Sequence, residues 1–140
     1  MTVFYVDSSV VLRALLWDSP ATVEWFNLQR AVGNKLVASR IGELEVTRVA
    51  FNTKISREDL ENYTLRFAYT PVDDQLITEA LALNVVVKAA DGLHLVAALR
   101  LGTDKVVFVT HDSQLANAAK QLGFRVLDPV TDDPGRLPVA

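Results

Sequence analysis

The chain has 140 residues, of which 50% are hydrophobic, and its formal net charge is −3. This length and composition suit one globular domain with a single sizeable core. The chain contains no cysteine, which excludes disulfides and thiolate metal sites and fits a reducing cytoplasm. We expect neither a membrane span, since no apolar run approaches the roughly 20 residues required, nor a secretory signal. Nucleic-acid binders are more often basic, so this chain would need a local basic patch or a bound cation beside a phosphate.

Short apolar strands alternate with helices, which predicts an α/β fold whose parallel sheet is covered on both faces. One domain is expected over residues 1–128, followed by an irregular tail over 129–140 that holds three of the five prolines. The expected strands cover residues 2–6, 35–38, 69–72, 105–109 and 124–127, and the expected helices cover 8–16, 20–32, 40–52, 56–67, 74–83, 91–101 and 112–122.

Acidic residues stand where predicted strands give way to helices. Asp7 directly follows the first strand in "VFYVDSS", Asp112 comes after "KVVFVT", and Asp91 begins a helix. Ligands of open α/β sheets bind at the carboxyl ends of the strands, so these acids are candidates for a common site. Each acid by itself can also be explained as a helix N-cap, whose side chain accepts a hydrogen bond from a free backbone N–H.

One predicted helix carries both Glu43 and Glu45. At about 100° per residue, Glu45 falls within the apolar arc that holds Leu44 and Phe51, and Glu43 projects roughly opposite. A carboxylate on an apolar stripe is costly unless it is paired or binds a cation. Two interpretations are therefore open for Glu45, an ion pair with Arg48 and an inward-pointing metal ligand. Glu43 is expected to be a solvated surface charge.

Four inward-pointing acids without thiols would form a site rich in oxygen ligands. Such ligands suit Mg²⁺ or Mn²⁺ better than Zn²⁺. Because like charges raise one another's pKa, a cluster of ionised carboxylates is stabilised by a cation. Water bound to that cation becomes a nucleophile, and the cation stabilises charge on a phosphoryl group. The cation would also provide the positive charge that this acidic chain needs beside a phosphodiester.

Four segments of the chain together resemble the PIN-domain ribonucleases. They are "YVDSSVVLRAL", "SRIGELEVTR", "ADGLHLVAA" and "VTHDSQLANAAKQLG", in this order, and the resemblance covers about residues 2–127. Within these ribonucleases the chain looks most like the VapC-type toxins of bacterial toxin–antitoxin pairs. The resemblance implies a PIN-like α/β/α sandwich with a central, mainly parallel sheet. It also implies hydrolysis of RNA phosphodiester bonds, Mg²⁺ or Mn²⁺ as cofactor, a homodimer, and inhibition by a small VapB-type antitoxin.

The resemblance also implies roles for individual residues, and it selects Glu45 over Glu43. The implied catalytic metal ligands are Asp7, Glu45, Asp91 and Asp112, with Ser9 and Thr110 as hydrogen-bond partners that orient carboxylates. Glu45 is implied as a direct or water-mediated ligand, and Asp112 also admits contact through water. Ser9 and Thr110 admit helix capping as the alternative.

Four further residues have open interpretations. Arg13 and Arg40 are candidate phosphate contacts because each stands near a metal-bearing junction, and solvated surface charge is the alternative. His94 is expected to be a hydrogen-bonded structural histidine. His111 lies in a turn, where contact with the substrate is one interpretation.

Two competing classes of function remain to be compared. A catalytically silent RNA- or partner-binding module on the same fold is the alternative to a nuclease, although a scaffold has no use for converging carboxylates. Trp17 and Trp25 could stack on RNA bases, but core packing or a dimer interface is the preferred interpretation. A phosphatase of the haloacid-dehalogenase type would need a second Asp where this chain has Ser9.

Overall fold

A computed structural model gives the fold of residues 1–16 and 18–131. The predictions for Trp17 and for residues 132–140 of the tail lie outside the described residues. Residues 129–131 form a turn after the last strand. No helix in the described ranges is long and apolar enough to cross a membrane.

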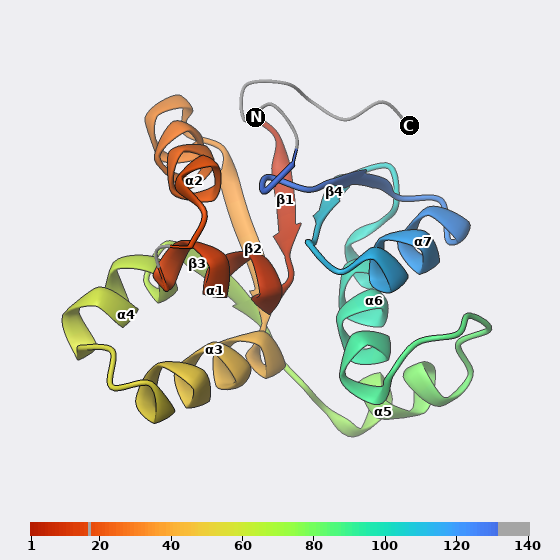
Figure 1. The fold of residues 1–140 in the computed structure, drawn as a ribbon. Helices are drawn as coiled ribbons and strands as arrows, with labels where there is room; N and C mark the ends of the chain where they lie inside the picture. Colours follow the sequence, from red (N-terminus) through yellow and green to blue (C-terminus); the bar gives the residue numbers. More distant parts are fainter. Residues whose placement is uncertain (17, 132–140) are drawn as a thin grey trace.

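Within the described part of the chain, the strands form one five-stranded sheet of order β3-β2-β1-β4-β5 (Figure 1). Every pairing is parallel, which confirms the predicted α/β class. The prediction for the third strand was wrong by two residues, because Phe67 pairs with Leu36 and packs against the ring of Phe26. The strands are β1 (Val3–Val6), β2 (Lys35–Ser39), β3 (Phe67–Thr70), β4 (Val106–Val109) and β5 (Arg125–Leu127).

Helices cover both faces of the sheet and complete the sandwich. Helices α1 to α4 pack on one face and α5 to α7 on the other (Figure 1). The helices are α1 (Ser8–Leu15), α2 (Pro20–Val32), α3 (Arg40–Asn52), α4 (Arg57–Thr64), α5 (Asp74–Leu81), α6 (Ala89–Leu101) and α7 (Ser113–Gln121).

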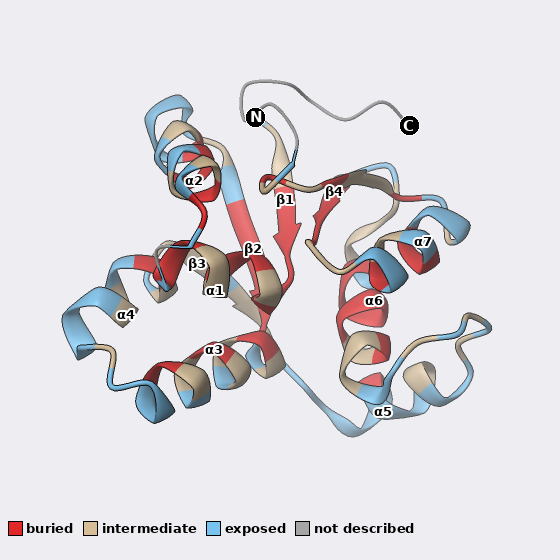
Figure 2. Ribbon diagram, viewed as in Figure 1, coloured by how far each residue is buried: buried red, intermediate tan, exposed pale blue. Residues whose placement is uncertain are grey.

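The strand period of two divides the core between the two faces. Phe4 and Val6 of β1 belong to the part under α1 to α4, whereas Tyr5 belongs to the part under α5 to α7. Figure 2 shows this burial along the strands and on the helix faces that meet them. Trp25 is fully buried, and its ring packs edge-on against two phenylalanine rings. The distance between ring centroids is 5.1 Å to Phe4 and 5.0 Å to Phe26. The prediction of core packing for Trp25 is confirmed.

The strand order reverses between β1 and β4, which makes their carboxyl ends a topological switch point. From β1 the chain moves to β2 and β3 on one side, then returns to β4 and β5 on the other. Such a reversal is where open parallel sheets bind ligands. Asp7 directly follows β1, and its backbone N–H donates to the carbonyl of Val109 at the end of β4, at 2.9 Å. The first candidate acid therefore lies at this switch point.

Candidate active site

Asp7 occupies the N-cap position of α1, but its side chain makes no capping hydrogen bond among the described residues. Instead, its Oδ2 accepts hydrogen bonds from the hydroxyls of Ser9 at 2.7 Å and Thr110 at 2.9 Å. The residue is only 4% exposed. Capping is therefore the wrong explanation for this side chain. Two hydroxyl groups, one from each neighbouring segment, hold this buried carboxylate in place.

The same hydroxyls join the segments that follow β1 and β4. Ser9 Oγ accepts a hydrogen bond from the backbone N–H of His111 at 3.2 Å, and Thr110 Oγ1 accepts one from Asp112 N–H at 3.1 Å. Asp112 does cap α7, because its Oδ1 accepts from the backbone N–H of Leu115 at 3.0 Å. That bond uses one carboxylate oxygen, so capping and a ligand role for Asp112 are compatible.

Asp91 lies inside the first turn of α6, since the N-cap position is Lys88. The N-cap explanation of Asp91 was therefore wrong. Burial, followed by the negative charges of Asp7 and Asp112, raises the pKa of Asp91 above its ordinary value. Such a shift indicates that acids from three separate segments share one electrostatic environment. The structure thus brings together carboxylates that are far apart in the sequence.

Glu45 pairs with a histidine and not with Arg48. Its Oε1 lies 2.7 Å from Nε2 of His94, whereas the guanidinium of Arg48 lies over the ring of Phe51, 5.1 Å from its centroid. The intrahelical ion pair was therefore a wrong interpretation. Burial alone would raise the pKa of Glu45, but the hydrogen bond and positive charge of His94 outweigh it and lower that pKa.

The apolar arc assigned to α3 was also wrong. Leu44 is 54% and Phe51 is 71% exposed, so that arc does not face the core. The helix instead buries Gly42, Val46 and Ala50. Glu45 consequently lies at the border of the buried face and not in its middle. Its carboxylate nevertheless meets a buried partner, the imidazole of His94.

His94 links two of these acids, although the sequence analysis expected it to have only a structural role. It is fully buried, its Nδ1 lies 2.9 Å from the hydroxyl of Tyr5, and its Nε2 lies 3.6 Å from Asp7 Oδ1. The prediction of a hydrogen-bonded histidine is confirmed. Burial acts to lower the pKa of His94, but the hydrogen bond with Glu45 and the charge of Asp7 outweigh it and raise that pKa. The available sequence signal was spacing, because His94 follows Asp91 by three residues on one helix.

Gly42 gives this histidine its space. A Cβ at position 42 would lie 3.2 Å from Cε1 of His94, and both residues are buried. We expect Gly42→Ala to push the imidazole away from Glu45, and the crowding to offset the gain in helix propensity of about 1 kcal/mol. Thermal unfolding should therefore show no stabilisation, while the pKa of Glu45, followed by carboxyl NMR, should rise toward its ordinary value. A more stable variant with an unchanged Glu45 pKa would contradict this packing argument.

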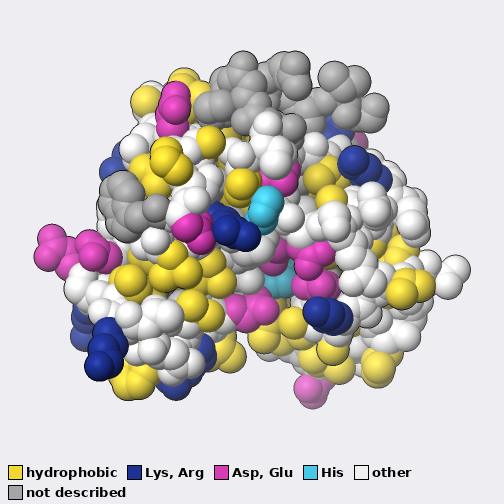
Figure 3. Space-filling model, viewed as in Figure 1, with side chains coloured by type: hydrophobic (Ala, Val, Ile, Leu, Met, Phe, Trp, Pro, Cys, Tyr) yellow, Lys and Arg dark blue, Asp and Glu magenta, His cyan; other side chains and the backbone are white. Residues whose placement is uncertain are grey.

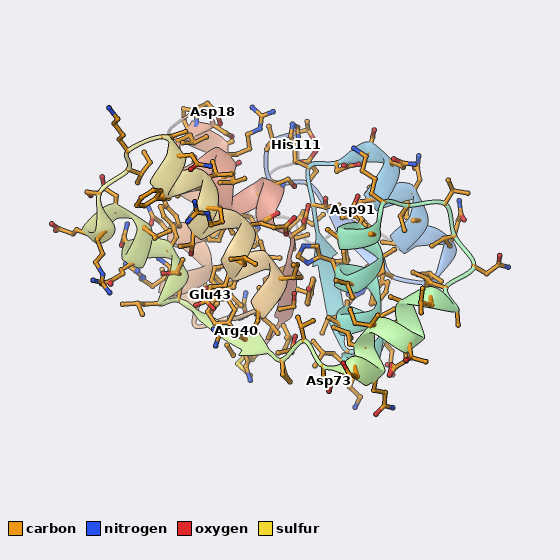
Figure 4. The ribbon with its side chains drawn as sticks, turned by 90° about the horizontal axis from the view of Figure 1, so that it is seen from below. Asp18, Arg40, Glu43, Asp73, Asp91 and His111 are labelled. Carbon is orange, nitrogen blue, oxygen red and sulfur yellow. The ribbon has the colours of Figure 1, made fainter. Side chains whose placement is uncertain are left out.

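The two candidate arginines each form an ion pair with a nearby acid. Arg40 pairs with Glu43 at 2.7 Å, and in Figure 4 these two lie away from Asp91 and His111. Glu43 is thus an ion-paired charge and not a free one. Arg13 pairs with Asp18 at 3.2 Å. Arg13 follows Ser9, whose hydroxyl bonds to Asp7, by four residues of α1, about one helical turn.

The acids fit a divalent cation by their chemistry. Within residues 1–16 and 18–131, no group of three or more His, Cys, Asp or Glu side chains is already arranged to hold a metal ion. The donors are nonetheless hard carboxylate oxygens, and the raised pKa of Asp91 is caused in part by neighbouring negative charge. A cation would relieve that repulsion. In Figure 3, acidic side chains gather over the middle of the displayed face, with histidine and basic side chains beside them.

The family model of the PIN domain matches residues 4–121, and this chain belongs to the PIN-domain family. It is 27% identical over 142 residues to Ribonuclease VapC47 of Mycobacterium tuberculosis (strain CDC 1551 / Oshkosh), covering 94% of this chain and 96% of that protein. Its fold resembles VapBC2 from Rickettsia felis bound to a DNA fragment from their promoter. There the TM-score is 0.69 at 12% identity, covering 91% of this chain and 98% of that one. VapBC-1 from nontypeable Haemophilus influenzae has a TM-score of 0.64 at 16% identity, with coverage of 91% and 98%.

Proposed function

We propose that this chain is a divalent-metal-dependent endoribonuclease and the toxin of a VapBC-type toxin–antitoxin pair. The observation that carries the proposal is the environment of Asp7, a buried carboxylate that makes no capping hydrogen bond within the described ranges and accepts hydrogen bonds from the hydroxyls of Ser9 and Thr110. Such an arrangement has a cost in stability without a ligand. The similarity to a ribonuclease along nearly the whole chain supports RNA as the substrate.

Each residue of the site has a defined task in this proposal. Asp7, Asp91 and Asp112 would hold Mg²⁺ or Mn²⁺, with Glu45 as a direct or water-mediated ligand. When bound, the ion would lower the pKa of a water molecule and stabilise charge on the phosphoryl group.

The surrounding residues orient these ligands and contact the substrate. Ser9 and Thr110 hold one oxygen of Asp7, and His94 holds Glu45. Arg13 is a proposed phosphate contact. Arg40 remains a weaker one because it already pairs with Glu43.

The proposed partners follow from the same family membership. Solved structures with a similar fold include VapBC complexes, so we propose a VapB-type antitoxin as the cognate inhibitor, a homodimer as the assembly, and the cytoplasm as the place of action. Exposed apolar side chains on α3 and α5, such as Leu44 at 54% and Leu81 at 83%, offer surfaces for such contacts.

Cleavage of total cellular RNA by the purified, antitoxin-free chain tests the activity. We expect discrete cuts with Mg²⁺ or Mn²⁺ and none with EDTA. An absence of cleavage with either metal, in a protein shown to be folded, would favour the silent binding module. Cleavage that persists in EDTA would contradict the metal-dependent mechanism.

Metal binding should also stabilise the fold in a pH-dependent way. Because the metal binds the ionised carboxylates and the pKa of Asp91 is raised, affinity should increase as pH rises through that pKa. At a free Mn²⁺ concentration of 100 times Kd, linkage predicts about 2.7 kcal/mol of added stability. Thermal unfolding with and without Mn²⁺ across pH 4 to 8 measures this. Equal stabilisation at both ends of the range would argue against carboxylate ligands.

A further inference from the structure

A second polar pair lies beside the acids and is not used in the mechanism above. His111 Nδ1 lies 3.0 Å from Asp128 Oδ2 and 3.2 Å from its Oδ1. Asp128 directly follows β5, and its Oδ1 also accepts a hydrogen bond from the backbone N–H of Val130 at 2.9 Å. The two residues therefore follow the carboxyl ends of the neighbouring strands β4 and β5, at the same end of the sheet as Asp7.

Asp128 determines which nitrogen of the imidazole is available. An ionised carboxylate only accepts hydrogen bonds, so the Nδ1 of His111 must donate to it. In the part of the chain that the structure describes, no group bonds to Nε2. The side chain is 27% exposed. His111 is thus held by one ring nitrogen and presents the other for a ligand.

The backbone of His111 is tied to the metal-site carboxylate. Its N–H donates to Ser9 Oγ at 3.2 Å, and the Ser9 hydroxyl donates to Asp7 Oδ2 at 2.7 Å. Figure 4 shows His111 and Asp91 on the same side of the molecule. A phosphodiester that reaches the acids would therefore pass beside this imidazole.

We propose that His111 contacts the sugar–phosphate backbone of the RNA through Nε2, next to the scissile phosphate, and that Asp128 is the residue that positions its ring. This inference rests on the proposed ribonuclease function and deepens it. With Nδ1 as the donor to Asp128, the neutral ring accepts at Nε2 from a ribose 2′-hydroxyl. The protonated ring donates there to a phosphate oxygen. Both are contacts with the same backbone.

Three substitutions of His111 separate its two nitrogens. The amide of His111→Asn falls near the position of Nδ1, whereas the amide of His111→Gln reaches toward that of Nε2. We expect His111→Ala and His111→Asn to lower kcat/KM on a defined RNA about tenfold, mainly through KM, and His111→Gln to retain most of the activity. Equal activity in all three variants and the wild type would overturn the proposal.

Asp128 has its own variant and a matched control. Asp128→Asn should raise KM severalfold, because the ring loses its ionised acceptor. Asp104 is an exposed acid that precedes β4, at the opposite end of that strand, so Asp104→Asn should keep the wild-type KM. If both variants behave alike, Asp128 has no positioning role and that part of the proposal fails.

Two binding measurements separate this proposal from a general disturbance of the site. Calorimetric Mn²⁺ affinity should be unchanged in His111→Ala, and a parallel loss of metal affinity would overturn the proposal by showing that Asp112 had moved. Fluorescence anisotropy in EDTA should show that His111→Ala binds single-stranded RNA more weakly than the wild type does. If the DNA of the same sequence is affected equally, the contact is to phosphate, and if DNA is unaffected, it is to the 2′-hydroxyl.

The same measurements keep this inference distinct from the proposed function. A wild-type chain that cleaves no RNA but binds it less well after His111→Ala would refute the nuclease and support the contact. A wild-type chain that cleaves RNA, with RNA binding and kcat/KM unchanged in every variant, would support the nuclease and refute the contact by His111. Absence of both cleavage and RNA binding in the wild type would refute both.

Discussion

Asp7→Asn is expected to abolish metal-dependent RNA cleavage, with a loss of at least about 10³-fold in kcat/KM. The asparagine amide keeps nearly the shape of the carboxylate and can still accept from the Ser9 and Thr110 hydroxyls. It removes the negative charge, however, and a neutral amide oxygen binds a divalent cation more weakly than a carboxylate oxygen does. Cleavage of a defined RNA under single-turnover conditions measures the effect.

A second readout shows whether Asp7 acts as proposed. Part of the raised pKa of Asp91 comes from the charge of Asp7, so this pKa should fall toward its ordinary value in Asp7→Asn. Carboxyl NMR titration without metal reports it. Glu58→Gln provides the control, since Glu58 is an exposed acid in the first turn of α4 and its substitution should leave cleavage unchanged. Activity of Asp7→Asn within tenfold of the wild type would remove Asp7 from the metal site.

His94→Ala is expected to reduce both stability and activity. The substitution empties a fully buried position and leaves the Tyr5 hydroxyl and Glu45 without the partner that they share. Cavity formation and the loss of the hydrogen bond to the buried Tyr5 hydroxyl each have a cost, and together we expect about 2–4 kcal/mol of lost stability. Urea unfolding measures this loss. Activity should fall at least tenfold, because Glu45 is no longer oriented toward the other acids.

Tyr5→Phe separates the structural role of His94 from its role at the site. This variant removes the hydrogen bond to His94 Nδ1 but leaves the bond from Nε2 to Glu45. We expect a loss of stability of about 1 kcal/mol and nearly normal cleavage. If Tyr5→Phe and His94→Ala lose cleavage equally, under conditions where both proteins remain folded, both hydrogen bonds of His94 are needed for activity. Cleavage retained in His94→Ala would show that Glu45 needs no orientation.

The order of strands and helices was readable from the sequence, because it depends on local patterns. Short apolar runs and the regular alternation of strands with helices gave most element positions correctly. The boundaries that failed were decided by tertiary contacts. The third strand begins at Phe67 because that ring fills the core beside Phe26. Helix α6 begins at Ala89, two residues before the acid that was expected to cap it.

The sequence by itself determined which acids could form a site, since their residue types, their positions after strands and the family motifs are all local properties. Only the tertiary structure decided what each acid does there. A carboxylate next to a helix caps it or does not according to which hydroxyls reach it, and Thr110 reaches Asp7 across 103 positions of the chain. Glu45 pairs with His94 and not with Arg48, because the packing of α3 against α6 brings the buried imidazole Nε2 of His94 to 2.7 Å from Glu45 Oε1. Helical periodicity cannot reveal such a partner, because it describes one helix at a time and not the surface against which that helix packs.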